Sequence, residues 1–360
     1  MSRIYNIAVV GAGIGERQTS GLMRLQDRFR IKVICDRNAE RAGKLADQIA
    51  RAGAPRPDVV SDFGDELLGR SDVDIVSVCL PPFLHFEASK RTLEAGKHTV
   101  CEKPLVGSLA EVDALERITA ASGRMLMPVF QYRFGRGLQK AKHLLHSGAA
   151  GKVYAASIET HWTRGMDYYA VPWRGKLSTE FGGALLGHSI HIHDILTELL
   201  GPVASVSALA AVRVNPIETE DCAAVIFEMV NGALVTSSTT LGSADELTRL
   251  RVACENVTMI SNPSPYTPDR EPWSFIPKAP RDEAFLAAAM ADAPDGAEGY
   301  TGQFARYHDA LEGKSALPVN VTDAYRSIEL ASAMYHSART GERVRLPIAK
   351  DHPVYGGWRL

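Results

Sequence analysis

The segment Ile4-Tyr5-Asn6-Ile7-Ala8-Val9-Val10-Gly11-Ala12-Gly13-Ile14-Gly15 sets the architecture of this chain. Its apolar run is typical of a buried β-strand, and helical sequence follows the glycines. Gly11 permits a tight turn, and Gly13 lets backbone N–H groups approach a pyrophosphate at the positive end of the helix. The third glycine of G-x-G-x-x-G would fall at Glu16, so the match is imperfect. The segment predicts a dinucleotide-binding turn, with an ordinary strand–helix turn as the alternative.

An acid ends the second predicted strand, Ile31–Cys35. Asp36 lies about 20 residues after the glycines, where a carboxylate accepts hydrogen bonds from a ribose diol. A carboxylate there favours NAD because it repels the 2′-phosphate of NADP. The neighbouring Arg37 offers a guanidinium that would bind this phosphate. NAD is therefore the expected cofactor, and NADP stays open as the alternative.

The pattern of apolar segments changes part-way along the chain. Up to residue 128, strands rich in Val and Ile alternate with helices, which predicts a doubly wound parallel sheet. Beyond it, longer alternating runs and a hairpin signal at Asn231-Gly232 predict a large, open, mostly antiparallel sheet. We expect an α/β protein with a Rossmann domain over 1–128 and an α+β substrate and oligomerisation domain over 129–360, whose C-terminal helix can pack back on the first.

Further expectations concern individual segments of the second domain. Residues 250–260 read as one strand, and residues 261–294, rich in proline, alanine and acid, read as a surface excursion or lid. A strongly periodic helix is predicted over about 323–340.

Composition narrows the class of protein. The 360 residues are 45% hydrophobic and 23% charged, which is typical of a soluble globular protein. The formal net charge of −2 gives no indication that the protein binds nucleic acid or an anionic membrane. The five cysteines are widely spread, which favours reduced thiols. No apolar run reaches membrane-span length, and the N-terminus enters a strand without a signal peptide. We expect a cytoplasmic location.

A charged tetrapeptide follows the predicted strand at residues 98–101. In Cys101-Glu102-Lys103-Pro104, the proline keeps Lys103 out of the helical region. An ammonium at the carboxyl end of a parallel strand lies where open α/β sheets bind their ligands. Lys103 is therefore a candidate catalytic and cofactor-binding residue.

Three histidines stand close together where an apolar helix opens, ahead of Leu200. His188, His191 and Asp194 are spaced three apart and would share one helix face, whereas His193 points elsewhere. A neutral imidazole with a pKa of about 6.5 suits a general base, and Asp194 would orient His191. A zinc site is the alternative, but no ligand pattern completes it, so no metal is predicted.

These motifs, in this order, resemble the Gfo/Idh/MocA oxidoreductase family. The resemblance also covers the runs 78–85, 93–105 and 331–341, and so nearly the whole chain. It implies a Rossmann domain, an open-sheet domain that often forms the oligomer interface, a nicotinamide cofactor, and a sugar or cyclitol whose secondary alcohol is oxidised. It implies that Lys103 contacts cofactor and reacting hydroxyl, and that His191 accepts the proton.

The resemblance and the patterns together give the predicted site. Expected at the cofactor are Gly11, Gly13, Ile14, Gly15, Asp36, Arg37, Leu80, Pro81, His85, Glu102, Lys103, Gln131, Trp173 and Arg174. Expected at the substrate are Lys103, Arg133, Trp162, Arg164, Tyr168, His188 and His191. Expected to be catalytic are Lys103, His191, His188 and Asp194.

One position departs from the family pattern. Many dehydrogenases of the family that this chain resembles carry aspartate four residues before the catalytic histidine, where this chain has Gly187. Either His188 compensates or the substrate is held differently. Three functions follow as hypotheses: an NAD(P)-dependent sugar or polyol dehydrogenase that forms a dimer or tetramer, a glycosidase that uses transient oxidation by NAD, and a non-catalytic sensor of nucleotide or sugar.

Overall fold

The computed structural model describes residues 3–358, which form two compact units. The first unit runs to Gln131 and takes in Gly299–Tyr325 from late in the chain. The second unit runs from Tyr132 to Glu298 and continues from Arg326. Each unit is built on its own β-sheet.

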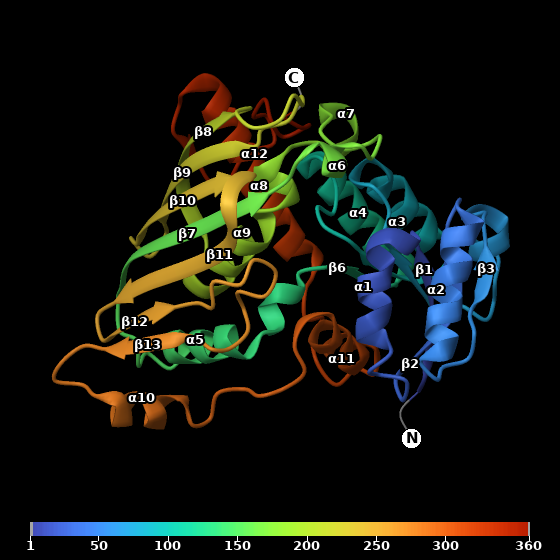
Figure 1. The fold of residues 1–360 in the computed structure, drawn as a ribbon, viewed down its shortest axis with the longest axis horizontal. Coiled ribbons are helices and arrows are strands. Elements are labelled where there is room, and N and C mark those ends of the chain that lie inside the picture. The colour runs from blue at the N-terminus through green and yellow to red at the C-terminus, as the bar shows by residue number, and fades with distance from the viewer. Residues whose placement is uncertain (1–2, 359–360) are drawn as a thin grey trace. The chain divides into compact units, whose positions relative to one another are not determined.

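The first sheet is parallel and has six strands within the described residues, in the order β3-β2-β1-β4-β5-β6. Its strands are β1 (Tyr5–Val10), β2 (Phe29–Cys35), β3 (Asp58–Val60), β4 (Ile75–Val78), β5 (His98–Cys101) and β6 (Leu126–Pro128). The order reverses between β1 and β4, which is where doubly wound sheets bind ligands. The predicted Rossmann topology is confirmed, and Figure 1 shows these strands with their covering helices.

Helices flank this sheet, and their ends follow the local sequence. They are α1 (Ala12–Leu22), α2 (Ala39–Arg51), η1 (Gly64–Leu68), η2 (Pro82–Leu84), α3 (His85–Glu94), α4 (Leu109–Ser122) and α11 (Gly299–Leu311). The Ser108 hydroxyl caps α4 by accepting from Glu111 N, and the helix ends at Gly123, which has a positive φ of 62°. Helix α11 packs on α1 at Gly21, where any side chain in place of glycine would collide with Tyr300.

The second sheet has eight strands in the described part of the chain, in the order β13-β12-β11-β7-β10-β9-β8-β14. They are β7 (Val153–Thr163), β8 (Val203–Ala211), β9 (Cys222–Met229), β10 (Leu234–Thr240), β11 (Gly242–Cys254), β12 (Val257–Ile260), β13 (Ser274–Pro277) and β14 (Val344–Arg345). Every pairing is antiparallel except that between β7 and β10. The predicted mostly antiparallel sheet is confirmed (Figure 1).

The helices of the second unit include the one that carries the histidines. They are η3 (Gln131–Phe134), which begins at the last residue of the first unit, α5 (Arg136–His146), α6 (Met166–Tyr169), α7 (Leu177–Glu180), α8 (Ala184–Gly187), α9 (Ile190–Leu200), α10 (Glu283–Met290) and α12 (Val321–Thr340), which passes from the first unit into the second. Helix α9 packs on β7 and on α5.

Three local predictions differ from the structure. Residues 250–260 form no single strand, because β11 and β12 turn at Glu255 and Asn256 and pair with each other. The segment 261–294 contains an edge strand, β13, and a helix, α10, so part of the predicted excursion belongs to the sheet. The helix predicted to open ahead of His188 is interrupted between α8 and α9.

Candidate active site

The glycine loop makes close contacts that are possible only because glycine has no side chain. Gly11 has a φ of 98°, and a Cβ there would lie 2.3 Å from the carbonyl oxygen of Cys79 at the end of β4. A Cβ on Gly15 would lie 2.7 Å from Cγ1 of Val9, so Gly15 allows close packing of α1 on β1. That is the part usually played by the third glycine of the motif, and here it falls one position early.

Space is open in front of this loop. A Cβ on Gly13 would meet nothing within 4 Å among the described residues. The N-terminus of α1 has no side-chain cap, and Ile14 beside it is 36% exposed. Backbone N–H groups at such an end bind anions well. The residues present therefore fit the pyrophosphate of a dinucleotide.

The Asp36 carboxylate lies at the same loop. Its Oδ2 accepts a hydrogen bond from Ala12 N at 2.8 Å, and its Oδ1 accepts one from Asn38 N at 2.8 Å. Arg41 reaches Oδ2 at 4.0 Å, and Arg37 is exposed. The negative charge of Asp36 is thus fixed beside the end of α1, where a ribose would follow the pyrophosphate.

Glu102 is buried next to the turn that carries Lys103, and its carboxylate accepts hydrogen bonds from several residues. The carboxylate, 4% exposed, accepts from Gln18 Nε2 at 2.8 Å, from Tyr300 Oη at 3.0 Å and from Lys103 N at 3.3 Å. The Lys103–Pro104 peptide bond is cis. The Glu102 carboxylate therefore holds the backbone of the Lys103 turn in place and is not exposed to solvent.

His85 ties the lysine turn to the end of β4. Its Nε2 lies 2.7 Å from the Leu80 carbonyl oxygen, and its Nδ1 lies 2.7 Å from the Pro104 carbonyl oxygen. Burial lowers the pKa of His85. Leu80 and Pro81 are half-buried on the adjoining turn.

Gln131, at the start of η3, has a buried side-chain oxygen. Its Oε1 has no hydrogen-bond partner within the described residues. A buried amide oxygen of this kind usually finds a donor, which a bound ligand can supply. This observation also fits a cofactor contact.

His191 lies in the first turn of α9 in the second unit. The side chain is 7% exposed, and its ring stacks on Tyr132 of η3 with centroids 4.5 Å apart and an interplanar angle of 26°. The Asp194 carboxylate, one turn along, accepts two hydrogen bonds from Arg133, at 2.8 Å from Nε and 2.6 Å from Nη2. The predicted orienting acid is thus held by a guanidinium.

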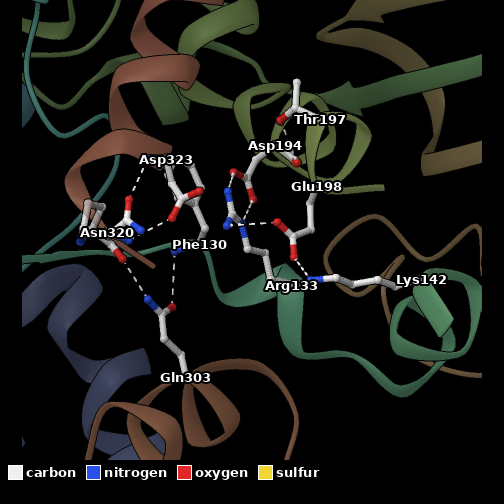
Figure 2. A network of polar contacts seen from close by, with 10 residues as sticks. Phe130, Arg133, Lys142, Asp194, Thr197, Glu198, Gln303, Asn320 and Asp323 are labelled. Carbon is white, nitrogen blue, oxygen red and sulfur yellow. Dashed lines mark hydrogen bonds and ion pairs between the residues drawn. The ribbon is translucent and has the colours of Figure 1, made fainter. Parts of the chain in front are cut away.

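Arg133 belongs to a chain of charged side chains, shown in Figure 2, in which Arg133 and Asp194 are buried and Glu198 and Lys142 are half-buried. Its Nη1 lies 3.1 Å from Glu198 Oε2, and Glu198 also pairs with Lys142 of α5. Arg133 is 6% exposed, and all three of its nitrogens contact carboxylates of α9. This geometry ties η3, and with it Tyr132, to the helix of His191.

The other two histidines have different surroundings from His191. His188 lies in the break between α8 and α9, so it does not share the regular face predicted for it with Asp194. His193 faces the sheet, where its Nε2 lies 3.2 Å from Ser237 Oγ, and burial lowers its pKa to about 3.

His188 joins an aromatic cluster that the structure assembles from distant segments. Its ring meets Trp162 edge-on at 5.2 Å and Tyr168 at 5.6 Å. The Arg164 guanidinium lies 4.9 Å from the Trp162 ring and 5.3 Å from the Tyr168 ring. Tyr266 completes the cluster, 4.9 Å from Trp162, so four of the predicted substrate residues lie together here.

Trp173 and Arg174 also lie side by side. The Arg174 guanidinium stacks over Trp173 at 4.3 Å and over Tyr168 at 3.9 Å, and it pairs with Glu180 Oε1 at 3.2 Å. Glu180, Tyr132 and Tyr266 were not predicted, because none of them stands in a recognisable sequence motif. Only the folded chain brings them to the predicted residues.

Family models cover both units of this chain. A model described as the oxidoreductase family with an NAD-binding Rossmann fold matches residues 5–130, and a model of the GFO/IDH/MocA C-terminal domain matches residues 138–260. The chain belongs to the Gfo/Idh/MocA oxidoreductase family. Its first unit is an NAD-binding Rossmann domain, as predicted.

Individual relatives agree with this assignment. The WlbA dehydrogenase of Bordetella pertussis, solved in complex with NADH and UDP-GlcNAcA, is 26% identical with a TM-score of 0.82, and the match covers 96% of this chain and 100% of that chain. An uncharacterised oxidoreductase of Synechocystis is 26% identical over 245 residues, which are 62% of this chain and 62% of that protein. A glycosyl hydrolase family 109 protein of Streptomyces niveus is 28% identical over 188 residues, 50% of this chain and 38% of that protein. The chain thus aligns with less than two thirds of these two curated relatives.

Residues 3–358 lack two kinds of feature. No helix among them has the length and apolar character needed to cross a bilayer. No group of three or more His, Cys, Asp or Glu side chains among them gathers as a metal site would require.

Proposed function

We propose that this NAD-binding oxidoreductase transfers a hydride between the secondary alcohol of a sugar or polyol and the nicotinamide. The observation that carries the proposal is His191, a buried imidazole stacked on Tyr132, in a chain whose other unit is an NAD-binding Rossmann domain. An imidazole is the usual proton acceptor when an alcohol is oxidised near neutral pH.

Each residue has a defined part in this reaction. His191 takes the hydroxyl proton, and Lys103 donates a hydrogen bond to the same oxygen and favours its developing negative charge. Bound NAD supplies the hydride acceptor. Arg133 and Asp194 position η3 and α9, and Glu102 with His85 fixes the lysine turn.

The aromatic cluster around His188 is the proposed wall for the substrate. Trp162, Tyr168 and Tyr266 offer ring faces that pack on sugar C–H surfaces, and Arg164 is already paired with Glu246 at 2.7 Å. Because this arginine is neutralised within the protein, the wall suits a substrate with hydroxyl groups. The WlbA relative was solved with a sugar nucleotide, which supports a sugar as the substrate class.

A sugar and polyol screen tests the proposal. Formation of reduced nicotinamide is followed by absorbance, with NAD and NADP tested side by side. We expect turnover with at least one sugar or polyol, and a loss of at least about a hundredfold in His191→Asn and in Lys103→Met. His146→Asn and Lys90→Met are the matched controls, because neither residue is among those predicted to contact the cofactor or the substrate. Near-wild-type turnover in His191→Asn would overturn the assigned role.

The second candidate is a glycosidase that oxidises its substrate transiently and regenerates NAD. The similarity to the glycosyl hydrolase family 109 protein of Streptomyces niveus favours it. Chromogenic glycosides distinguish the two functions. Release of the aglycone without net formation of NADH would support the glycosidase, whereas NADH formed in proportion to sugar consumed would support the dehydrogenase.

We also propose that the open sheet of the second unit forms a homo-oligomer. Leu209, Ile226 and Leu234 lie on β8, β9 and β10 and are 71%, 58% and 59% exposed. The strand register puts all three on one face of the sheet. Such an apolar face is typical of a subunit interface. Sedimentation should show a dimer or tetramer, and Leu209→Asp with Ile226→Asp should shift it toward monomer.

A further inference from the structure

Glu220 binds the start of α8 with both its carboxylate and its carbonyl oxygen. Its Oε2 accepts a hydrogen bond from Gly183 N at 2.9 Å, and its Oε1 accepts one from Leu185 N at 2.9 Å. Its carbonyl oxygen accepts a third from Ala184 N at 2.8 Å. The first N–H groups of a helix have no acceptor within that helix. A single buried residue therefore satisfies three successive N–H groups where α8 begins.

Tyr335 of α12 holds the Glu220 carboxylate from the other side of the sequence. Its hydroxyl donates a hydrogen bond to Glu220 Oε1 at 2.9 Å. Gly182 allows this approach, because a Cβ there would lie 2.0 Å from the Tyr335 hydroxyl oxygen. The Trp358 ring stacks on Tyr335 with centroids 5.5 Å apart, and its Nε1 donates to the Phe181 carbonyl oxygen at 2.8 Å. Two late segments of the chain thus hold the turn that leads into α8.

Helix α8 contacts the aromatic cluster through its first residue. Ala184 is fully buried and packs together with Trp162 and Leu241, with Tyr169 against them. The Ala184 carbonyl oxygen also accepts from His188 N at 3.2 Å, and the His188 ring meets the Trp162 ring edge-on. The first turn of α8 is therefore in contact with one member of the aromatic cluster and hydrogen-bonded to another.

We propose that Glu220 and Tyr335 are positioning residues for the aromatic cluster, acting through α8 on Trp162 and His188. The inference rests on the proposed function, in which this cluster contacts the sugar. Each step from Tyr335 to Trp162 is a direct contact within the second unit. The series of contacts does not run through His191, which follows the break after α8, so sugar binding should change more than proton transfer.

Two substitutions break this series, and the chain offers a matched control for each. Tyr335→Phe removes only the hydroxyl. Glu220→Gln turns an amide N–H group toward a donor, because both carboxylate oxygens accept hydrogen bonds. The control for the tyrosine is Tyr307→Phe, since Tyr307 is also buried in a helix but its hydroxyl has no hydrogen-bond partner among residues 3–358. The control for the acid is Glu329→Gln, since Glu329 is buried and accepts from Ile348 N at 2.7 Å.

Steady-state kinetics with the sugar or polyol found in the screen test the effect on binding. The assay is run at about pH 8.5, where Glu220 is charged because burial raises its pKa only to about 7. We expect KM for the sugar to rise by about three- to tenfold in Tyr335→Phe and by more than about tenfold in Glu220→Gln, with kcat within about twofold of wild type. A loss of folded protein would instead lower kcat at an unchanged KM. Both controls should keep the wild-type values, and an unchanged KM in both test variants would overturn the proposal.

Two further measurements on the purified full chain need no substrate. Hydrogen exchange at residues 183–185, followed by mass spectrometry, should be at least about tenfold faster in both test variants and unchanged in both controls. The emission of Trp162, taken as the difference between each protein and the same protein with Trp162→Phe, should move to longer wavelength in the test variants as the cluster loosens. Unchanged exchange and emission would refute the positioning role. If the wild-type chain oxidises no sugar but both changes are seen, the proposed function fails and the positioning of the cluster stands.

Discussion

At Gly11 a side chain would collide with the Cys79 carbonyl oxygen, whereas at Asp194 the loss of a side chain would leave the buried Arg133 guanidinium without its bidentate acceptor. The cofactor loop is built from backbone and empty space, and it is sensitive to added atoms. The histidine segment is built from side chains that come from several elements, and it is sensitive to removed atoms. The two regions should therefore respond to opposite kinds of substitution.

The largest effect is expected for Arg133→Met. Removing one partner of a buried ion pair costs about 3–5 kcal/mol, because the Asp194 carboxylate, 2% exposed, stays buried without its partner while Glu198 beside it is half-buried. Urea unfolding measures this loss. Arg136→Met is the control, since its pair with Asp295 is exposed and should contribute less than about 1 kcal/mol. Equal losses in the two variants would show that the buried network does not hold the segment together.

Gly11→Ala tests the opposite sensitivity. The added Cβ overlaps backbone 2.3 Å away and favours a negative φ, so we expect a loss of about 3 kcal/mol in unfolding free energy. Gly13→Ala has open space and should leave unfolding unchanged while weakening NAD binding, which calorimetry can measure. A Gly11→Ala variant as stable as the wild type would contradict the described loop geometry.

The pH dependence of stability should reveal His193. Its pKa falls from 6.5 to about 3 on burial, so the folded state binds fewer protons than the unfolded state between these values. This contribution is complete above pH 6.5 and is lost as the pH falls toward 3, by about 2 kcal/mol between pH 6.5 and pH 4.5. Glu220 acts in the opposite direction, because its pKa is raised to about 7 by burial.

The difference between wild type and His193→Gln isolates this effect. Glutamine keeps a polar group near Ser237 but does not titrate. We expect the variant to lose less stability than the wild type on acidification, as measured by thermal unfolding from pH 7 to pH 4.5. Parallel curves would show that His193 does not titrate on unfolding. His146→Gln, at an exposed position, should give the wild-type curve.

The smallest effect is expected for Tyr132→Leu. Loss of the ring stacked on His191 should remove about 0.5–1.5 kcal/mol, which is up to roughly tenfold in kcat/KM. Tyr132→Phe keeps the ring and serves as the control. Equal activity of the two variants would mean that the stacking does not position the imidazole.

Local patterns predicted those parts of the molecule that depend on local rules. The glycine turn, Asp36 and the parallel sheet follow from chain direction and strand–helix alternation, and the structure has them where the sequence indicated. The third glycine was harder, because the spacing gave Glu16 while the packing against Val9 is made by Gly15. Periodicity showed the helix after His191, but not the break at His188, where Ser189 Oγ turns to Thr239 Oγ1 at 2.7 Å.

The side-chain clusters depend on pairings far apart in the sequence. Arg133 with Asp194, Trp162 with Tyr266, and Glu180 beside Gly187 are joined only when the sheet and its helices assemble. A charged residue such as Arg133 looks like a substrate contact in a sequence, since nothing local shows that two acids on another helix will meet it. The chemical character of each residue could be predicted from the sequence, but the side chains that it contacts in the folded protein could not.

The return of the chain to its first unit has a consequence for biosynthesis. Phe29 of β2 is almost fully buried and packs edge-on to Phe304 of α11 at 5.8 Å and parallel to Tyr307 at 6.5 Å. These rings are not available until α11, which ends at Leu311, has left the ribosome. A nascent Rossmann unit must therefore wait, with part of its interior open to water, while the whole second sheet is translated.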